Sequence, residues 1–161
     1  MGYRAVDEIE NFRYDDCQIT GLYLRDEEIC IEVESLIVGR NNSQNTNFTE
    51  SYAGTTKMHF KGGKIEHAIK DGYRYYDANE VLLQEVKDRI LEDDEAADLY
   101  ANCGGSYLYN IEITDRAKEQ CCRLYIEFVD DENLPSESYT LEMSYDEAVF
   151  VWERYLNRVQ Q

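Results

Sequence analysis

The chain has 161 residues, a length that fits one folded domain, 1–161, and leaves little room for a second. Its net charge of −18 argues against binding to nucleic acid or to an anionic membrane surface, because both depend mainly on Lys and Arg. Apolar residues still make up 43% of the sequence and are spread along its whole length, so we expect a folded core and not a disordered chain.

The sequence also indicates in which cellular compartment the protein is expected. The first ten residues are acidic and contain no apolar segment, so they predict no secretory signal, and no run approaches transmembrane length. The five cysteines follow neither a disulfide framework nor the spacing of a zinc site; they are Cys17, Cys30, Cys103, Cys121 and Cys122. We therefore expect reduced, packed thiols in a cytoplasmic protein, with no metal and no other cofactor.

The N-terminal third predicts a short helix and then a β-hairpin. Residues 3–11 are predicted to be the helix, and apolar residues alternate from Cys17 onward. A turn at residues 25–28 brings the apolar side chains of both strands to one face. The partners in this register are Leu24 with Ile29, Leu22 with Ile31, and Thr20 with Val33. Residues 41–50 are polar and without periodicity, so we expect a loop there.

A second hairpin is predicted around the pair Gly62-Gly63, which suits a type I′ turn. This turn would place His59 opposite Glu66 on the polar face, and His67 opposite Met58 at the edge of the apolar face. A carboxylate beside an imidazole is an arrangement that a general base requires. An exposed cross-strand charge pair is the plainer interpretation of the same spacing.

The middle of the chain contains one ambiguous segment. Residues 73–76 read as a strand that ends at 77–80, whereas 81–91 fit a strand or the start of a helix equally well. A helix is predicted near 94–103, where Gly104-Gly105 follows as a stop signal. Cys103 would lie at the C-terminal end of that helix, where the helix dipole raises the pKa of a thiol, so packing is a better role for it than catalysis.

The last third predicts strands at 107–113, 122–128 and 139–143, followed by an amphipathic helix. Ser144 stands three residues before Glu147, which is the spacing of a capping box, and the apolar residues behind it follow a helical period. The C-terminal helix is accordingly expected near 145–158. Together these elements predict an α+β fold with a mostly antiparallel β-sheet that is curved and sandwich- or barrel-like.

The candidate binding residues are acidic clusters and alternating tyrosines. Carboxylates that converge from loops suit a cation or a basic partner, and tyrosine gives a large contact area at low entropic cost. Solvated turns, a helix start and sheet packing explain most such residues in ordinary proteins. The candidates are Asp93, Asp94, Glu95, Asp130, Asp131, Glu132, Tyr107 and Tyr109.

No phosphate-binding loop, dinucleotide fingerprint or metalloprotease motif occurs, so the residues favour a non-catalytic interaction domain over an enzyme. The expected partner is a basic protein, because the net charge is −18, or a second copy of the chain, since residues 51–70 carry a local charge of +3 from four Lys and one Glu. In size, acidity and fold class the chain resembles toxin-neutralising immunity proteins, a general likeness without a motif, which implies an inhibitor of a basic toxin. Two alternatives stay open: a carboxylate-dependent hydrolase or cation-dependent enzyme, and a sugar- or small-ligand-binding module that uses exposed Tyr.

Overall fold

The structure is a computed structural model that describes residues 2–132 and 135–159. Most of these residues lie in strands, and the helices are α1 (Asp93–Asn102) and the single 3₁₀ turn η1 (Ile9–Asn11). The strands in chain order are β1 (Tyr3–Val6), β2 (Phe12–Arg13), β3 (Gln18–Arg25), β4 (Glu28–Glu34), β5 (Ile37–Val38), β6 (Ser51–Ala53), β7 (Thr56–Lys61), β8 (Lys64–Lys70), β9 (Tyr73–Tyr76), β10 (Leu82–Val86), β11 (Arg89–Ile90), β12 (Tyr107–Ile113), β13 (Gln120–Val129), β14 (Pro135–Tyr145), β15 (Glu147–Trp152) and β16 (Tyr155–Arg158).

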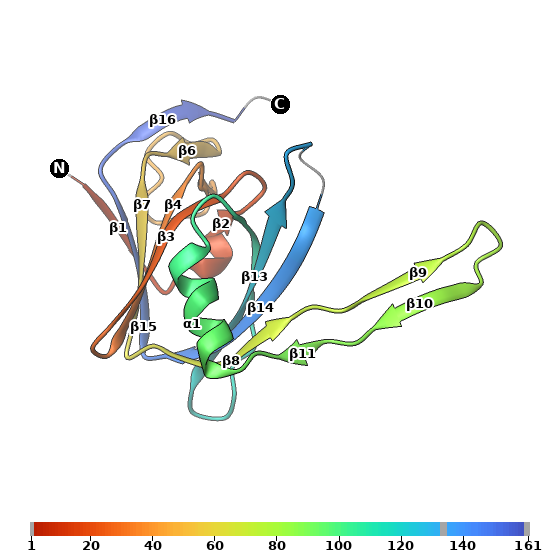
Figure 1. The fold of residues 1–161 in the computed structure, drawn as a ribbon. Coiled ribbons are helices and arrows are strands. Elements are labelled where there is room, and N and C mark those ends of the chain that lie inside the picture. Colours follow the sequence, from red (N-terminus) through yellow and green to blue (C-terminus); the bar gives the residue numbers. More distant parts are fainter. Residues whose placement is uncertain (1, 133–134, 160–161) are drawn as a thin grey trace.

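The main sheet closes on itself in an antiparallel ring (Figure 1). Its strand order is β1-β15-β7-β4-β3-β12-β13-β14-β8-β11. β7 runs on into β8, and β14 runs on into β15, and these two long strands pair with each other on both sides of a bend. These continuous strands therefore close the ring, with β1 and β11 as end strands beyond it. The predicted mostly antiparallel sheet is confirmed.

The pair Gly62-Gly63 forms the bend in this ring, so the predicted second hairpin is wrong. β7 pairs with β4 and β15, whereas β8 pairs with β14 and β11. Gly62 has a positive φ of 66°, and a Cβ there would lie 2.1 Å from Oδ2 of Asp146, which connects β14 to β15. Glycine permits a left-handed turn and a tight corner equally well, which is why the sequence pattern did not separate the two.

The first predicted hairpin is confirmed as β3 and β4. Leu24 pairs with Ile29, and Leu22 pairs with Ile31, as the alternation indicates. The third predicted pair is shifted, because a bulge at Thr20 makes Ile19 the partner of Val33. The inward residues Ile19, Leu22, Ile29, Ile31 and Val33 are almost fully buried, whereas Leu24, near the end of β3, is 54% exposed.

The predicted C-terminal helix near 145–158 is wrong, because these residues form the end of β14 and strands β15 and β16. In β15 Ala148, Val149, Phe150 and Trp152 are all buried, so both faces of the strand are covered. A strand buried on both faces loses the alternation of period two, and its apolar residues then also fit a helical period. The predicted helix over 3–11 is likewise replaced by β1 and η1.

The core fills the inside of the ring and continues into an aromatic cluster at one end. Phe12 contacts the rings of Phe150 and Trp152, and Phe60 packs edge-on against Tyr145 and Phe150. The smaller sheet, in the order β16-β6-β5-β2, covers this end of the ring (Figure 1). These aromatic contacts bury large apolar surfaces and supply much of the stability of the fold.

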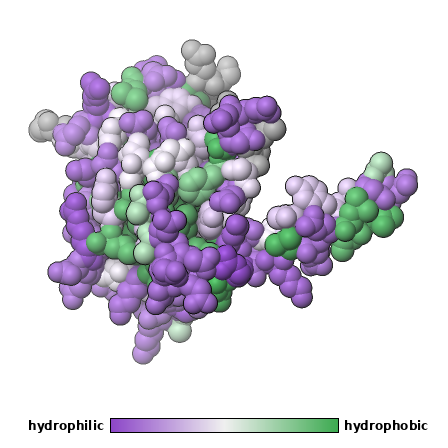
Figure 2. All heavy atoms as spheres, in the orientation of Figure 1, coloured by the Kyte–Doolittle hydropathy of each residue, from purple (hydrophilic) through white to green (hydrophobic). Residues whose placement is uncertain are grey.

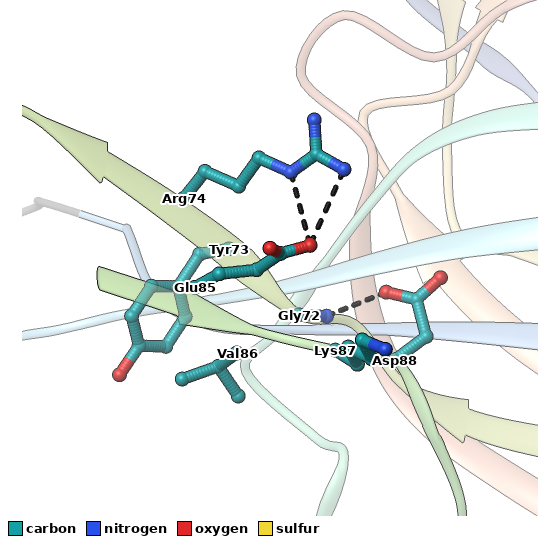
Figure 3. A pocket seen from close by; sticks show the side chains of 7 residues that line it. All are labelled: Gly72, Tyr73, Arg74, Glu85, Val86, Lys87 and Asp88. Atoms are coloured by element: carbon teal, nitrogen blue, oxygen red, sulfur yellow. Dashed lines mark hydrogen bonds and ion pairs between the residues drawn. The ribbon is translucent and has the colours of Figure 1, made fainter. Parts of the chain in front are cut away.

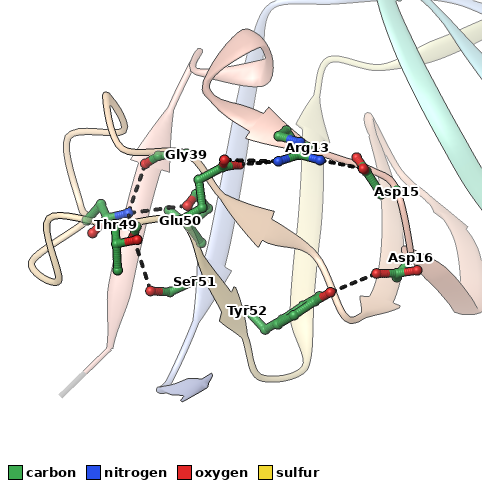
Figure 4. Close-up of polar contacts among 10 residues, drawn as sticks. Arg13, Asp15, Asp16, Gly39, Thr49, Glu50, Ser51 and Tyr52 are labelled. Atoms are coloured by element: carbon green, nitrogen blue, oxygen red, sulfur yellow. Dashed lines mark hydrogen bonds and ion pairs between the residues drawn. The ribbon is translucent and has the colours of Figure 1, made fainter. Parts of the chain in front are cut away.

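The predicted loop over 41–50 lacks strands and is held by polar contacts instead. Figure 4 shows the ion pair in which Nη1 of Arg13 on β2 lies 2.7 Å from Glu50, and the hydrogen bond from the Tyr52 hydroxyl to Asp16. Gln44 of this loop accepts a hydrogen bond from the backbone N–H of Arg4 on the outer edge of β1. The loop therefore protects one edge of the main sheet.

Of the three predicted helices, the middle one is present as α1, within one residue of its expected bounds. It lies beside β3 and buries Leu99, while the Glu92 and Glu95 side chains form a capping box at its start. None of the helices in the described part of the chain has the length and apolar content needed to cross a membrane.

Candidate functional site

An arm of two strands, residues 72–90, projects from the ring (Figure 1). β9 and β10 pair with each other in a separate two-stranded sheet. Asp77 forms the turn between them, because its Oδ1 accepts hydrogen bonds from the backbone N–H groups of Asn79 and Val81. The ambiguous segment 81–91 is therefore mostly strand, as β10 and β11.

The arm is rich in exposed apolar side chains, which Figure 2 shows as green residues along the projection. Eight large hydrophobic residues in it are more than a third exposed, and Leu83 reaches 66%. They are Tyr73, Tyr75, Tyr76, Val81, Leu82, Leu83, Val86 and Ile90. Isolated exposed hydrophobics are normal on proteins, but a contiguous group is typical of an interaction surface.

Both faces of the arm carry these side chains. The cross-strand pair Tyr73 and Val86 shares one face with Tyr75, whose ring lies 5.1 Å from that of Tyr73. Tyr76 and Leu82 form another apolar cross-strand pair. An isolated two-stranded hairpin is only marginally stable in water, and three or more strands or a packed face are needed for independent stability. The described residues therefore give the arm neither a third strand nor a packed face.

The root of the arm is tightly built (Figure 3). The backbone N–H of Gly72 donates a 2.6 Å hydrogen bond to Asp88, and a Cβ on Gly72 would lie 1.9 Å from the carbonyl oxygen of Val86. Arg74 and Glu85 form an ion pair across the two strands at 3.3 Å. A hollow of about 520 Å³ lies among these residues.

Asp71 anchors the root of the arm to β14 of the ring. Its carboxylate accepts a 2.7 Å hydrogen bond from the hydroxyl of Thr140, and its backbone N–H donates to Ser138 on β14. Burial raises the pKa of Asp71, while the Thr140 hydrogen bond lowers it and Asp88 raises it further. These contacts fix the position at which the arm leaves the ring.

The first predicted acidic cluster lies beside this root, at the start of α1. Glu95 forms a bidentate ion pair with Arg89 on β11, at 2.8 and 2.9 Å, while Asp93 and Asp94 occupy the same first turn. Glu95 also lines a groove of about 290 Å³ with Glu137 and other residues of the root. The carboxylates thus stabilise the helix start and its contact with the arm.

The pKa of Glu95 provides a test of this ion pair. The hydrogen bond from Arg89 and the backbone N–H of Glu92 lower the pKa of Glu95 to about 2 from an ordinary value of 4.5. The lowered pKa contributes stability above pH 4.5, which is lost as the pH falls toward 2. We expect a carboxyl-carbon NMR titration of Arg89→Gln to show the pKa moving back toward 4.5. An unchanged pKa would contradict the ion pair.

The other predicted candidates lie elsewhere. Asp130–Glu132 follow β13, and the backbone N–H of Glu132 donates to Asp130. Figure 1 places this connection near the opposite end of the ring from the start of α1, so the two acidic segments do not converge. Tyr107 is half-buried between Gln18 and Glu127, and Tyr109 is 43% exposed beside the ring of Tyr125.

The predicted pairing of His59 with Glu66 is wrong, because β7 and β8 do not pair. Nδ1 of His59 lies 3.0 Å from Glu28 on β4 instead, and Glu66 forms an ion pair with Arg116, which lowers the pKa of Glu66. His67 faces Glu142, not Met58. Each histidine is thus held by one carboxylate on the outside of the sheet.

One cysteine lies next to a histidine, yet the arrangement is not that of a nucleophile. Cys30 is a direct cross-strand partner of His59, whose Nδ1 lies 3.0 Å from Glu28. Cys30 is only 3% exposed, and burial raises its pKa, whereas a nucleophilic thiol needs a depressed pKa. Burial also raises the pKa of Cys17 to about 12 and of Cys103 to about 11. All five thiols are buried and free, which suits packing.

The arm was missed by reasoning from the sequence, although its parts were visible. Residues 73–76 and 81–86 are two β-prone segments around an Asp-x-Asn turn, which is a hairpin signal. Nothing in the residues indicates that the faces of this hairpin stay uncovered. Among the described residues there is no group of three or more His, Cys, Asp or Glu side chains placed to hold a metal ion. Comparison with known proteins found no family model, no curated protein and no solved structure that matches the chain.

Proposed function

We propose that this protein is a non-catalytic interaction domain that binds a basic protein, with the arm as its main contact element. The observation that carries the proposal is the exposure of eight large apolar side chains on a two-stranded arm whose root is fixed to the ring. Apolar surface that is buried on binding supplies affinity, and tyrosine is favoured at such surfaces. A fixed root reduces the entropy lost when the partner binds.

The net negative charge of the chain supports a positively charged partner. A net charge of −18 attracts cations and basic proteins over long distances, and it raises the rate of encounter at low salt. The narrowest form of the proposal is an immunity-type inhibitor of a basic toxin. The five free, buried thiols favour a reducing compartment such as the cytoplasm as the place of this interaction.

An arm-less variant tests the proposal. Lys70 and Arg89 are cross-strand partners, so residues 71–88 can be replaced by an Asn-Gly turn that joins them directly. Immobilised wild-type protein is expected to retain a basic protein from the source cell at low salt, with less retained at moderate salt. The arm-less variant is expected to lose this capture, because the apolar contact surface is gone.

The control for this experiment is the fold of the variant. The single tryptophan, Trp152, is buried far from the arm in the aromatic cluster, so its fluorescence reports whether the ring is intact. If a correctly folded arm-less variant captures the same protein as the wild type, the arm is not the contact element. Capture that does not change with salt would contradict a basic partner.

A further inference from the structure

The outer edge of the arm is unpaired along its length. β10 is an end strand of the two-stranded sheet, and β11 is an end strand of the main sheet. On their inner side they pair with β9 and β8. On their outer side, no strand among the described residues pairs with residues 82–90. A row of free backbone N–H and C=O groups of this kind is a template for another strand.

The charge of the arm differs from that of the whole chain. Residues 72–90 carry three basic and four acidic side chains, a net charge of −1, which leaves −17 for the rest. A basic partner therefore gains little from charge along this edge, whereas a second copy meets little repulsion there.

The residues of the edge are complementary to themselves. An antiparallel pairing of the two outer edges with its two-fold axis at Val86 sets β10 of one copy beside residues 87–90 of the other, which include β11. It places Glu85 opposite Lys87 of the second copy, and this pair occurs twice. Lys87 forms no ion pair within the described residues, and Glu85 also contacts Arg74 on its inner side. Opposite charges directly across two strands stabilise their pairing, and the same pairs favour this register over shifted ones.

We infer that a second copy of this chain pairs with the outer edge of β10 and β11, so that β10 of each copy gains residues 87–90 of the other copy as an antiparallel neighbour. The inference rests on the proposed function in taking the arm as a contact element. It adds that the edge binds the same chain, while the faces that carry Tyr73 and Tyr76 stay available to a different protein. A third strand also removes the marginal stability of an isolated two-stranded arm.

Charge reversal at the two positions tests the inference on the full chain. Sedimentation equilibrium is expected to give a dimer of the 18.9 kDa wild-type chain. Lys87→Glu places Glu opposite Glu, and Glu85→Lys places Lys opposite Lys, so each variant alone is expected to dissociate, with an increase in Kd on the order of tenfold or more. An equimolar mixture of the two variants restores both opposite-charge pairs, and the dimer is expected to return as a heterodimer.

A wild-type chain that stays monomeric at all concentrations overturns the inference, and so does a mixture in which the dimer does not return. Neither result affects the capture of a basic protein by wild-type but not arm-less protein, so the proposed function is judged separately. Conversely, a dimer that responds to the charge reversals as expected supports the pairing of the edge even if no basic protein is captured.

Discussion

The variant Gly72→Ala is expected to separate the two strands of the arm at their root. Its Cβ would lie 1.9 Å from the backbone oxygen of Val86, so the strands must move apart by about 1.5 Å to restore ordinary contact near 3.5 Å. The displaced atoms belong to the backbone, which cannot rotate away as a side chain can. The expected result is loss of the cross-strand nuclear Overhauser contacts between Tyr73 and Val86, measured by NMR, together with faster amide exchange over 82–88.

Gly105→Ala provides the matched control for this substitution. Gly105 has a positive φ of 92°, but a Cβ there meets no atom within 4 Å. The substitution Gly105→Ala therefore introduces the backbone strain of a left-handed alanine, about 1–2 kcal/mol, without a steric clash and at a distance from the arm. Intact contacts between Tyr73 and Val86 in Gly72→Ala would show that the root is not as closely packed as described.

Phe60→Ala is expected to cause the largest loss of stability among the single substitutions considered. Phe60 is fully buried on β7 and packs edge-on against Tyr145 and Phe150. Removing a buried Phe ring costs about 3–5 kcal/mol, because apolar contact is lost and a cavity remains. The free energy of unfolding is obtained from urea titrations followed by the fluorescence of Trp152, the single tryptophan of the chain.

Two further variants make this measurement decisive. Leu24→Ala removes a side chain that is 54% exposed, so a change within about 0.5 kcal/mol is expected. If Phe60→Ala does not fold, Phe60→Leu keeps most of the volume and is expected to show a smaller loss in the same direction. A loss for Phe60→Ala no larger than that for Leu24→Ala would contradict the position of Phe60 in the core.

The elements predicted correctly are those in which one face is buried and the other is exposed to solvent. The hairpin of β3 and β4 was found because its apolar residues alternate around a charged turn, and α1 was found because Gly104-Gly105 ends it. β15 was missed because both of its faces are covered, so the sequence lacks the alternation that identifies a strand. Local periodicity reports burial, and it identifies an element only when burial is one-sided.

The candidate site was harder to predict because it depends on contacts between distant segments. Glu66 and His59 were paired on the assumption that Gly62-Gly63 closes a hairpin, whereas their actual partners, Arg116 and Glu28, come from other strands. Of the predicted acidic residues, Glu95 gains a specific partner, Arg89, on the segment that precedes the helix. The exposure of the arm could not be predicted, because the residue types in 73–86 also occur in half-buried hairpins.

The two free edges of the main sheet have consequences for how far assembly can proceed. A contact that uses the same edge on both copies closes at two subunits, whereas the open edge of β11 joined to the edge of β1 would repeat and build an endless filament. β1 has only four residues, and Gln44 of the neighbouring loop binds the backbone N–H of Arg4. The unequal protection of these edges thus disfavours head-to-tail growth, while the symmetric contact of the inferred dimer stays accessible.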